Sequence, residues 1–202
     1  MIDIPPIEAG LYLLTGAFAG FSAGLLGIGG GLVIVPVLYL IFSARGYDPG
    51  YLMHMALATS LATIILTSIS STLAHHRKNA VLWHIVILLT PGIGLGAWLG
   101  ANFAAQLDTS VLKPVFGVFE ITVALLIFSQ YQSVQHGRTI GTSNGLIGGS
   151  IIGAVSAIVG IGGGTLTVPF LHWHRINIKN AIATSAACGL PVAVFATVTY
   201  IL

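Results

Sequence analysis

Two near-identical glycine-rich stretches decide the fold of this chain: GLLGIGGGLVIVP at residues 24–36 and AIVGIGGGTLTVP at residues 157–169. Aligning residues 20–38 with residues 153–171 gives nine identities in 19 positions, and ALATS at residues 56–60 matches AIATS at residues 181–185. Glycine weakens a helix interior because it loses more conformational freedom on folding than other residues. The sequence therefore predicts two copies of one unit, each containing a helix broken at its glycines.

The composition is that of an integral membrane protein. Of the 202 residues, 55% are hydrophobic and 6% are charged, whereas soluble domains carry about 25% charged residues. The net charge of +2 is too small for a nucleic-acid surface. The first ten residues contain no lysine or arginine, so they lack the basic region of a signal peptide and we expect residue 1 to belong to the mature protein.

Apolar runs of the length needed to cross a bilayer, about 20 residues, fill most of the chain. Ordinary spanning helices are predicted at residues 52–74, 80–103, 111–129 and 181–202. The two glycine-broken segments, at residues 10–43 and 142–173, are different because each has more than 30 residues. As one straight helix, each would overshoot the hydrocarbon core. Each is therefore predicted to fold back as a hairpin of two short helices.

The basic residues favour the hairpins. If both broken segments fold back, five of the seven basic residues lie on one side of the membrane; if each crosses once, the division is three against four. An excess of basic residues marks the cytoplasmic side. Hairpins also make the second copy start on the opposite face, as in the inverted repeats of secondary transporters. The predicted fold class is an all-α polytopic membrane protein with inverted repeats.

The repeats set the predicted domain organisation. The first repeat covers residues 1–130, residues 131–141 form a linker, and residues 142–202 form a second repeat. The second repeat is predicted to be incomplete, because it has no counterpart of the helices at residues 80–103 and 111–129. We expect such a chain to be part of a longer protein or to complete itself by association.

The glycine breaks are the predicted binding site. A helix that stops inside the membrane leaves backbone groups unpaired, at several kcal/mol each in hydrocarbon. Where the second half-helix begins, its free N–H groups and positive dipole end favour an anion. Pro36 and Pro169 are expected close to the first turn of these half-helices, where a missing N–H costs little. The predicted substrate-binding residues are Gly27, Gly29, Gly30, Gly31, Thr59, Ser60, Gly160, Gly162, Gly163, Gly164, Thr184 and Ser185.

Other small and polar residues have separate interpretations. Gly16/Gly20/Gly24 and Gly92/Gly96/Gly100 are ladders of small residues that predict helix packing. Glu120, deep inside a predicted span, is a candidate for carrying a coupling proton. The histidines of HWH at residues 172–174 have no third ligand nearby, so neither a metal site nor a cofactor is expected.

Two alternatives to anion transport stay open. The first is a cation or metal-ion transporter that uses Glu120 and the histidines as ligands. The second is a non-transporting membrane assembly subunit. An enzyme is not expected, because neither Ser22 nor Cys188 has an evident histidine partner at a matching depth.

The duplicated GIGGG…VP with its downstream ATS, and HHRKNAVLW at residues 75–83, resemble the sulfite exporter TauE/SafE family of membrane permeases. The resemblance covers nearly all of the chain. It implies a secondary transporter of a small sulfur-containing or organic anion, such as sulfite or a sulfonate, working by alternating access in a bacterial-type inner membrane. The implied partners are this anion and the lipid bilayer, with a homo-oligomer as a further expectation.

Overall fold

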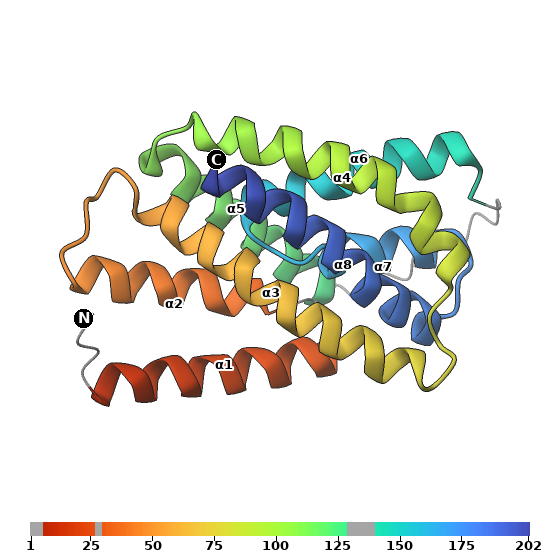
Figure 1. Ribbon diagram of the computed structural model, residues 1–202, viewed down its shortest axis with the longest axis horizontal. Coiled ribbons are helices and arrows are strands. Elements are labelled where there is room, and N and C mark those ends of the chain that lie inside the picture. The colour runs from red at the N-terminus through yellow and green to blue at the C-terminus, as the bar shows by residue number, and fades with distance from the viewer. Residues whose placement is uncertain (1–5, 27–29, 129–139) are drawn as a thin grey trace.

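The computed structural model describes residues 6–26, 30–128 and 140–202, which form eight α-helices and no strand (Figure 1). The predicted all-helical class is confirmed. The helices are α1 (Pro6–Leu26), α2 (Gly31–Ala44), α3 (Leu52–His76), α4 (Trp83–Ala105), α5 (Thr109–Phe128), α6 (Thr142–Val159), α7 (Gly164–Trp173) and α8 (Ile178–Ile201).

Each glycine-broken segment folds back on itself. In Figure 1, α1 and α2 run in opposite directions along the long axis of the molecule, and so do α6 and α7. The loop between α3 and α4, with Arg77 and Lys78, lies at the same end as the loop between α7 and α8, with Arg175. The loop between α2 and α3, with Arg45, lies at the opposite end. This is the distribution of basic residues that the hairpins require.

Helix length separates the spanning helices from the half-helices. Within the described residues, α3, α4, α6 and α8 are long and apolar enough to cross a bilayer. The helices that follow the two breaks are shorter, since α2 has 14 residues and α7 has 10. At 1.5 Å per residue, α7 extends only about 15 Å. Both half-helices therefore begin inside the apolar body of the protein.

Two glycine ladders hold α4 against α6. A Cβ atom added at Gly92, Gly96 or Gly100 would collide with carbonyl oxygens of α6. A Cβ atom added at Gly149 or Gly153 would collide with the backbone of α4. Small residues at these positions let the two backbones approach closely, which is the usual basis of helix association in membranes. The predicted packing role of the α4 ladder is confirmed.

The ladder of α1 is not packed in this way, so the prediction is wrong for Gly16 and Gly20. A Cβ atom added at either residue would have no heavy atom within 4 Å. Gly24 lies outside the residues whose surroundings the structure describes. The physical reason is that no helix of the described part of the chain occupies the position beside α1 that α4 occupies beside α6.

The second glycine break is buried in the first repeat. Ile161, which is fully buried, belongs to a hydrophobic cluster with Val35 of α2, Leu57 of α3 and Phe116 of α5. A second cluster joins α4 and α8. The break between α6 and α7 thus belongs to an apolar cluster with residues of α2, α3 and α5, and it lies beside the start of α2.

Candidate functional site

The two glycine breaks meet. A Cβ atom added at Gly31, the first residue of α2, would lie 2.5 Å from the carbonyl oxygen of Gly160 and 3.0 Å from Cα of Ile161. Gly160 is the C-cap of α6, so the start of α2 touches the end of α6. Glycine at position 31 is required because a side chain there would separate the two breaks. Gly27 and Gly29 of the first break lie outside the described residues.

The junction lies near the middle of two spanning helices. A Cβ atom added at Gly162 would contact Ile64, close to the midpoint of α3, at 2.9 Å. A Cβ atom added at Gly189, close to the midpoint of α8, would lie 2.6 Å from the carbonyl oxygen of Gly162. The breaks therefore come together near the middle of two helices that are long enough to span a bilayer.

The first turns of the two half-helices share a hydrogen-bond pattern at aligned positions, although the backbone of the N-cap differs, with φ of −70° at Gly30 and 74° at Gly163. The carbonyl of Gly30 accepts hydrogen bonds from the amides three and four residues further along, at 3.1 and 3.0 Å. The carbonyl of Gly163, 133 positions later, accepts the equivalent bonds at 3.2 and 2.8 Å. Neither N-cap provides a side-chain hydrogen bond. Both helix starts therefore present backbone N–H groups and a positive dipole end without a side-chain cap.

The backbone of the second break depends on two glycines and one serine. Gly160 and Gly163 have φ of 72° and 74°, in the left-handed region that favours glycine. Because Gly160 is the C-cap at which α6 ends, no amide from a further helical turn can donate to the carbonyl of this residue. The Ser60 hydroxyl donates a hydrogen bond to it instead, at 2.9 Å. This bond joins α3 of the first repeat to the break in the second.

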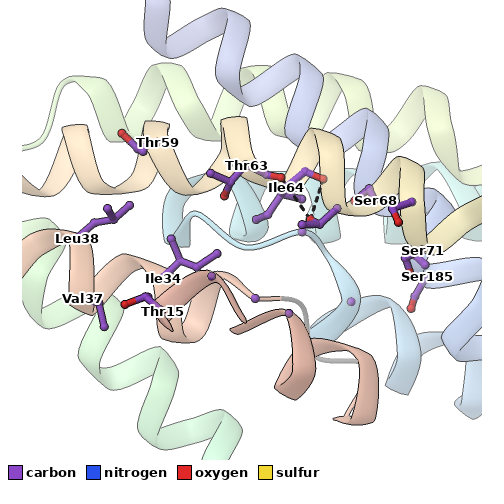
Figure 2. Close-up of a pocket in the computed structure, with 18 of the residues that line it drawn as sticks. Thr15, Ile34, Val37, Leu38, Thr59, Thr63, Ile64, Ser68, Ser71 and Ser185 are labelled. Atoms are coloured by element: carbon purple, nitrogen blue, oxygen red, sulfur yellow. Dashed lines mark hydrogen bonds between the residues drawn. The ribbon is translucent and has the colours of Figure 1, made fainter. Parts of the chain in front are cut away.

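A cavity of about 650 Å³ lies beside the junction, between α1, α2, α3 and α8 (Figure 2). Gly30, Gly162 and Gly164 form the part of its wall that belongs to the breaks. Its remaining polar lining is made mostly of hydroxyl groups, from Thr15, Thr59, Thr63, Thr67, Ser68, Ser70, Ser71 and Ser185. None of the described lining residues is Asp, Glu, Lys or Arg. The lining also includes the imidazole of His75, and the helix starts add positive potential where the breaks meet the cavity.

The four predicted hydroxyl ligands fall into two pairs. Ser60 and Thr184 are buried and bond to the backbone: Ser60 donates to Gly160, and Thr184 accepts from the amide just before α4 at 3.1 Å. Thr59 and Ser185 line the cavity. The Ser185 hydroxyl also donates to a carbonyl of its own helix at 2.8 Å. The first pair thus supports helix ends, and the second pair faces the cavity.

Two polar residues at the second break escaped the sequence analysis. Ser156 and Thr167 are fully buried, and neither hydroxyl has a hydrogen-bond partner among the described residues. Their oxygens lie 3.7 and 3.6 Å from a Cβ atom added at Gly163. The alignment of the two copies could have identified both residues, because the aligned positions of the first copy hold the apolar residues Ala23 and Ile34. The second break therefore carries two hydroxyls that the first does not.

The two prolines lie further into their helices than predicted. Pro36 and Pro169 are each the sixth residue of their half-helix, and not in the first turn, whose amides have no intrahelical partner. A residue at the sixth position normally donates to the carbonyl four residues earlier, which for Pro36 is that of Leu32. Each proline therefore removes a hydrogen bond from the first two turns and weakens the helix next to the break.

The other candidate residues lie away from the junction. Glu120 is half-buried on α5 and does not line the cavity. His172 and His174 contact backbone carbonyls of Ile176 and Phe170 at 3.4 and 2.8 Å. Within the described residues, no group of three or more His, Cys, Asp or Glu side chains is placed to hold a metal ion.

Comparison with known proteins identifies the family of the chain. The family model of the sulfite exporter TauE/SafE matches residues 12–202. The chain belongs to this family. A "probable membrane transporter protein" of Haemophilus influenzae is 38% identical over 192 residues, which cover 95% of this chain and 73% of the relative. Similar proteins from Methanocaldococcus jannaschii and Xylella fastidiosa are 29% and 30% identical, covering 87% and 92% of this chain. No solved structure matches.

Membership in the TauE/SafE family makes the chain a multi-pass membrane protein of a transporter family and not an enzyme. The three relatives are longer than the matched region, which covers 73%, 66% and 71% of their lengths. Their printed names specify membrane transport and no substrate. The chemistry of the cargo has to be argued from the site.

Proposed function

We propose that this chain transports a small sulfur-containing or organic anion, such as sulfite or a sulfonate, and that the starts of α2 and α7 bind it. The observation that carries the proposal is the meeting of two uncapped helix starts beside one cavity, with Gly31 against Gly160. Helix N-termini bind oxyanions because their amides point at the ligand and their dipoles favour negative charge.

The strength of this site suits a transporter. Each helix N-terminus contributes about 0.3–1 kcal/mol to the binding of a negative charge, and up to about 2 kcal/mol when partly buried. Two starts, with the exposed hydroxyl of Thr59 on the cavity wall, hold an anion without an ion pair. A lysine or arginine in the cavity would bind the anion more tightly and slow its release.

The site also suits alternating access by two inverted repeats. In Figure 1, α1 and α6 run in opposite directions, as do α3 and α8, which the repeat aligns with each other. An inverted repeat places the aligned residues Gly30 and Gly163 on either side of a pseudo-two-fold axis in the membrane plane. Rocking of one repeat against the other then opens the junction to each side in turn, with the anion held between the helix starts.

The hydroxyls of Ser156 and Thr167 give the second break a stronger donor set. Both groups surround Gly163, the N-cap of α7, and both are buried without a partner among the described residues. A buried hydroxyl without a partner costs about 1–3 kcal/mol. Neither residue lines the cavity, so a bridging water at the start of α7 would satisfy them and connect them to an anion bound there.

Ligand-dependent unfolding of the purified protein tests this function. A ligand that binds only the folded state at 100 times its Kd adds about 2.7 kcal/mol to the free energy of unfolding. Sulfite or a short alkylsulfonate is expected to raise Tm in a saturable way, whereas chloride at equal ionic strength is not. A rise in Tm with a divalent cation such as Zn²⁺, and none with either anion, would replace the proposal with the cation alternative.

A further inference from the structure

Among the described residues that line the cavity, only His75 has a side chain that can carry a positive charge. His75 belongs to the last turn of α3, and Ile182 and Ser185 of α8 line the same cavity. The glycine junction contacts α3 at Ile64, and the 11 residues from Ile64 to His75 correspond to about 16 Å along the helix axis. His75 therefore lies at one end of the cavity and not at the junction.

The ring of His75 has no hydrogen-bond partner in the described part of the chain. Four other histidines have a ring nitrogen within hydrogen-bond distance of a described group: His54, His76, His172 and His174. The repeat aligns position 75 with Tyr200 of α8, whose hydroxyl donates to the carbonyl of Ala157 at 3.2 Å. The aligned side chain of the second repeat thus joins α8 to α6, whereas the ring of His75 is left for a ligand in the cavity.

The end of the cavity at His75 is a basic mouth. Arg77 and Lys78 follow His75 in the chain, and the Lys78 amide donates to the His75 carbonyl at 3.1 Å. Arg175 and Lys179 lie in the α7–α8 loop and the first turn of α8, at the same end of the molecule (Figure 1). Within the described residues, these loops and the helix turns next to them contain no Asp or Glu. An opening with one sign of charge concentrates ions of the opposite sign.

The helices around the basic mouth carry few other titratable groups. In the described parts of α1, α3, α4, α7 and α8 and the α7 C-cap, they are Glu8, Tyr12, His54, His76, His84, His172, His174, Cys188 and Tyr200. The histidines at the same end as His75, which are residues 76, 84, 172 and 174, do not line the cavity. Lys78 is the charged group that acts on His75.

We infer that His75 is the entrance site for the transported anion on the basic side, where its protonated imidazole binds the anion before the anion reaches the helix starts. This inference rests on the proposed function. Histidine ordinarily changes its charge between pH 5 and 8, and a protonated imidazole donates charge-assisted hydrogen bonds to an oxyanion. The charge of Lys78 disfavours the protonated imidazole, and an anion at the mouth favours it. The proton and the anion therefore bind at this position together.

Hydroxyl-bearing residues connect the mouth with the junction. Ser71 lies four residues before His75 and so on the same face of α3. Ser68, Ser71 and Ser185 all line the cavity, and Figure 2 shows them at the same end of it. Gly162 and Gly164 of the second break follow on the wall. An anion that leaves His75 thus meets hydroxyl groups, and no acidic side chain of the described lining, before it reaches the start of α7.

The pH dependence of flux tests the entrance site, with methanesulfonate as the probe because its charge, unlike that of sulfite, does not change between pH 6 and 8. In proteoliposomes, the KM of the wild type is expected to be roughly five-fold lower at pH 6 than at pH 8, with Vmax little changed. His75→Gln should have the higher KM at both pH values. His75→Lys should have the lower KM at both, with a lower Vmax because a permanent charge slows release of the anion.

The matched control is His84→Gln, because His84 is exposed at the same end of the molecule but does not line the cavity. It should keep the pH profile of the wild type. Equal pH profiles of KM in the wild type and His75→Gln would overturn the entrance site and leave the proposed function standing. Absence of anion flux in the wild type would overturn both.

A second measurement needs no transport. Ser71→Cys introduces a thiol near His75, while the native Cys188 is fully buried. The probes are two thiosulfonate reagents of similar size, one with a sulfonate group and one with a trimethylammonium group. The ratio of their reaction rates cancels the ionisation of the thiol and reports the potential at the mouth. This ratio of anionic to cationic reagent should fall several-fold from pH 6 to pH 8, and it should be lower and constant when His75→Gln is added. The same change with and without His75 would overturn the inference.

Discussion

Gly30 and Gly31 are adjacent in the chain but have opposite surroundings, so replacing each by alanine separates the packing of the breaks from the binding of the anion. A Cβ atom at Gly31 would lie 2.5 Å from the carbonyl oxygen of Gly160, whereas ordinary contacts begin at 3.4 Å. The backbones must therefore separate by roughly 0.9 Å. Overpacking of this kind costs about 1–3 kcal/mol, or a fall in Tm of roughly 2–12 °C for a chain of this size.

Gly30→Ala is expected to have the opposite effect. Its φ of −70° suits alanine, and the nearest atom to an added Cβ is the flexible end of Ile34, at 3.3 Å. The free energy of unfolding should change by less than about 0.5 kcal/mol. Because Gly30 lines the cavity at the start of α2, the added methyl group restricts access to the amides. Loss of about 1 kcal/mol of anion binding corresponds to a roughly five-fold higher Kd.

Thermal unfolding with and without sulfite measures both effects on the same samples. Gly31→Ala is expected to lower Tm in the absence of sulfite, and Gly30→Ala is expected to reduce the sulfite-dependent rise in Tm. An unchanged Tm for Gly31→Ala would mean that the breaks do not touch. An unchanged sulfite response for Gly30→Ala would mean that the start of α2 is not part of the binding site.

Three further predictions test other parts of the structure. Ser60→Ala removes the donor to the buried carbonyl of Gly160 and should lower the free energy of unfolding by about 1–3 kcal/mol, measured by chemical denaturation in detergent. An unchanged free energy of unfolding would show that the bond is not formed. Gly96→Ala should lower Tm by several degrees because the added Cβ atom collides with the α6 backbone, whereas Gly16→Ala should leave Tm unchanged. Equal changes in Tm for the two variants would contradict the packing described for the two ladders. If Glu120 carries a coupling proton, Glu120→Gln abolishes the acceleration of sulfite flux by a proton gradient and leaves exchange of sulfite across the membrane intact. An unaltered response to the gradient would remove Glu120 from proton coupling.

Much of the fold follows from the sequence because the two repeats constrain each other. The length of each glycine-broken segment and the division of basic residues predicted the hairpins, and the structure has them. The α4 ladder of Gly92, Gly96 and Gly100 was predicted to pack because small residues at every fourth position form one face of a helix. The same spacing at Gly16 and Gly20 also predicted packing. Periodicity shows which face of a helix carries the small residues, but it does not show whether another helix packs against that face.

The site was predicted less completely, for a related reason. Glycine position and repeat alignment located the junction, yet the roles of the hydroxyls depend on which way each helix is turned. Ser60 and Ser185 occupy aligned positions, but Ser60 bonds to the opposite break while Ser185 lines the cavity. Ser156 and Thr167 were missed because serine and threonine in membrane helices commonly bond to their own helix backbone. Comparing the two copies position by position would have found them.

The most direct test of the central claim is the flux of labelled sulfite and of a short organic sulfonate into proteoliposomes that contain the wild-type chain or Gly30→Ala. The account predicts saturable anion flux for the wild type, competition between the two anions, and a weaker apparent affinity for the variant with the amount of inserted protein unchanged. Equal anion affinity in both proteins, or flux of a divalent cation in place of the anions, would contradict the claim that the paired helix starts bind the cargo.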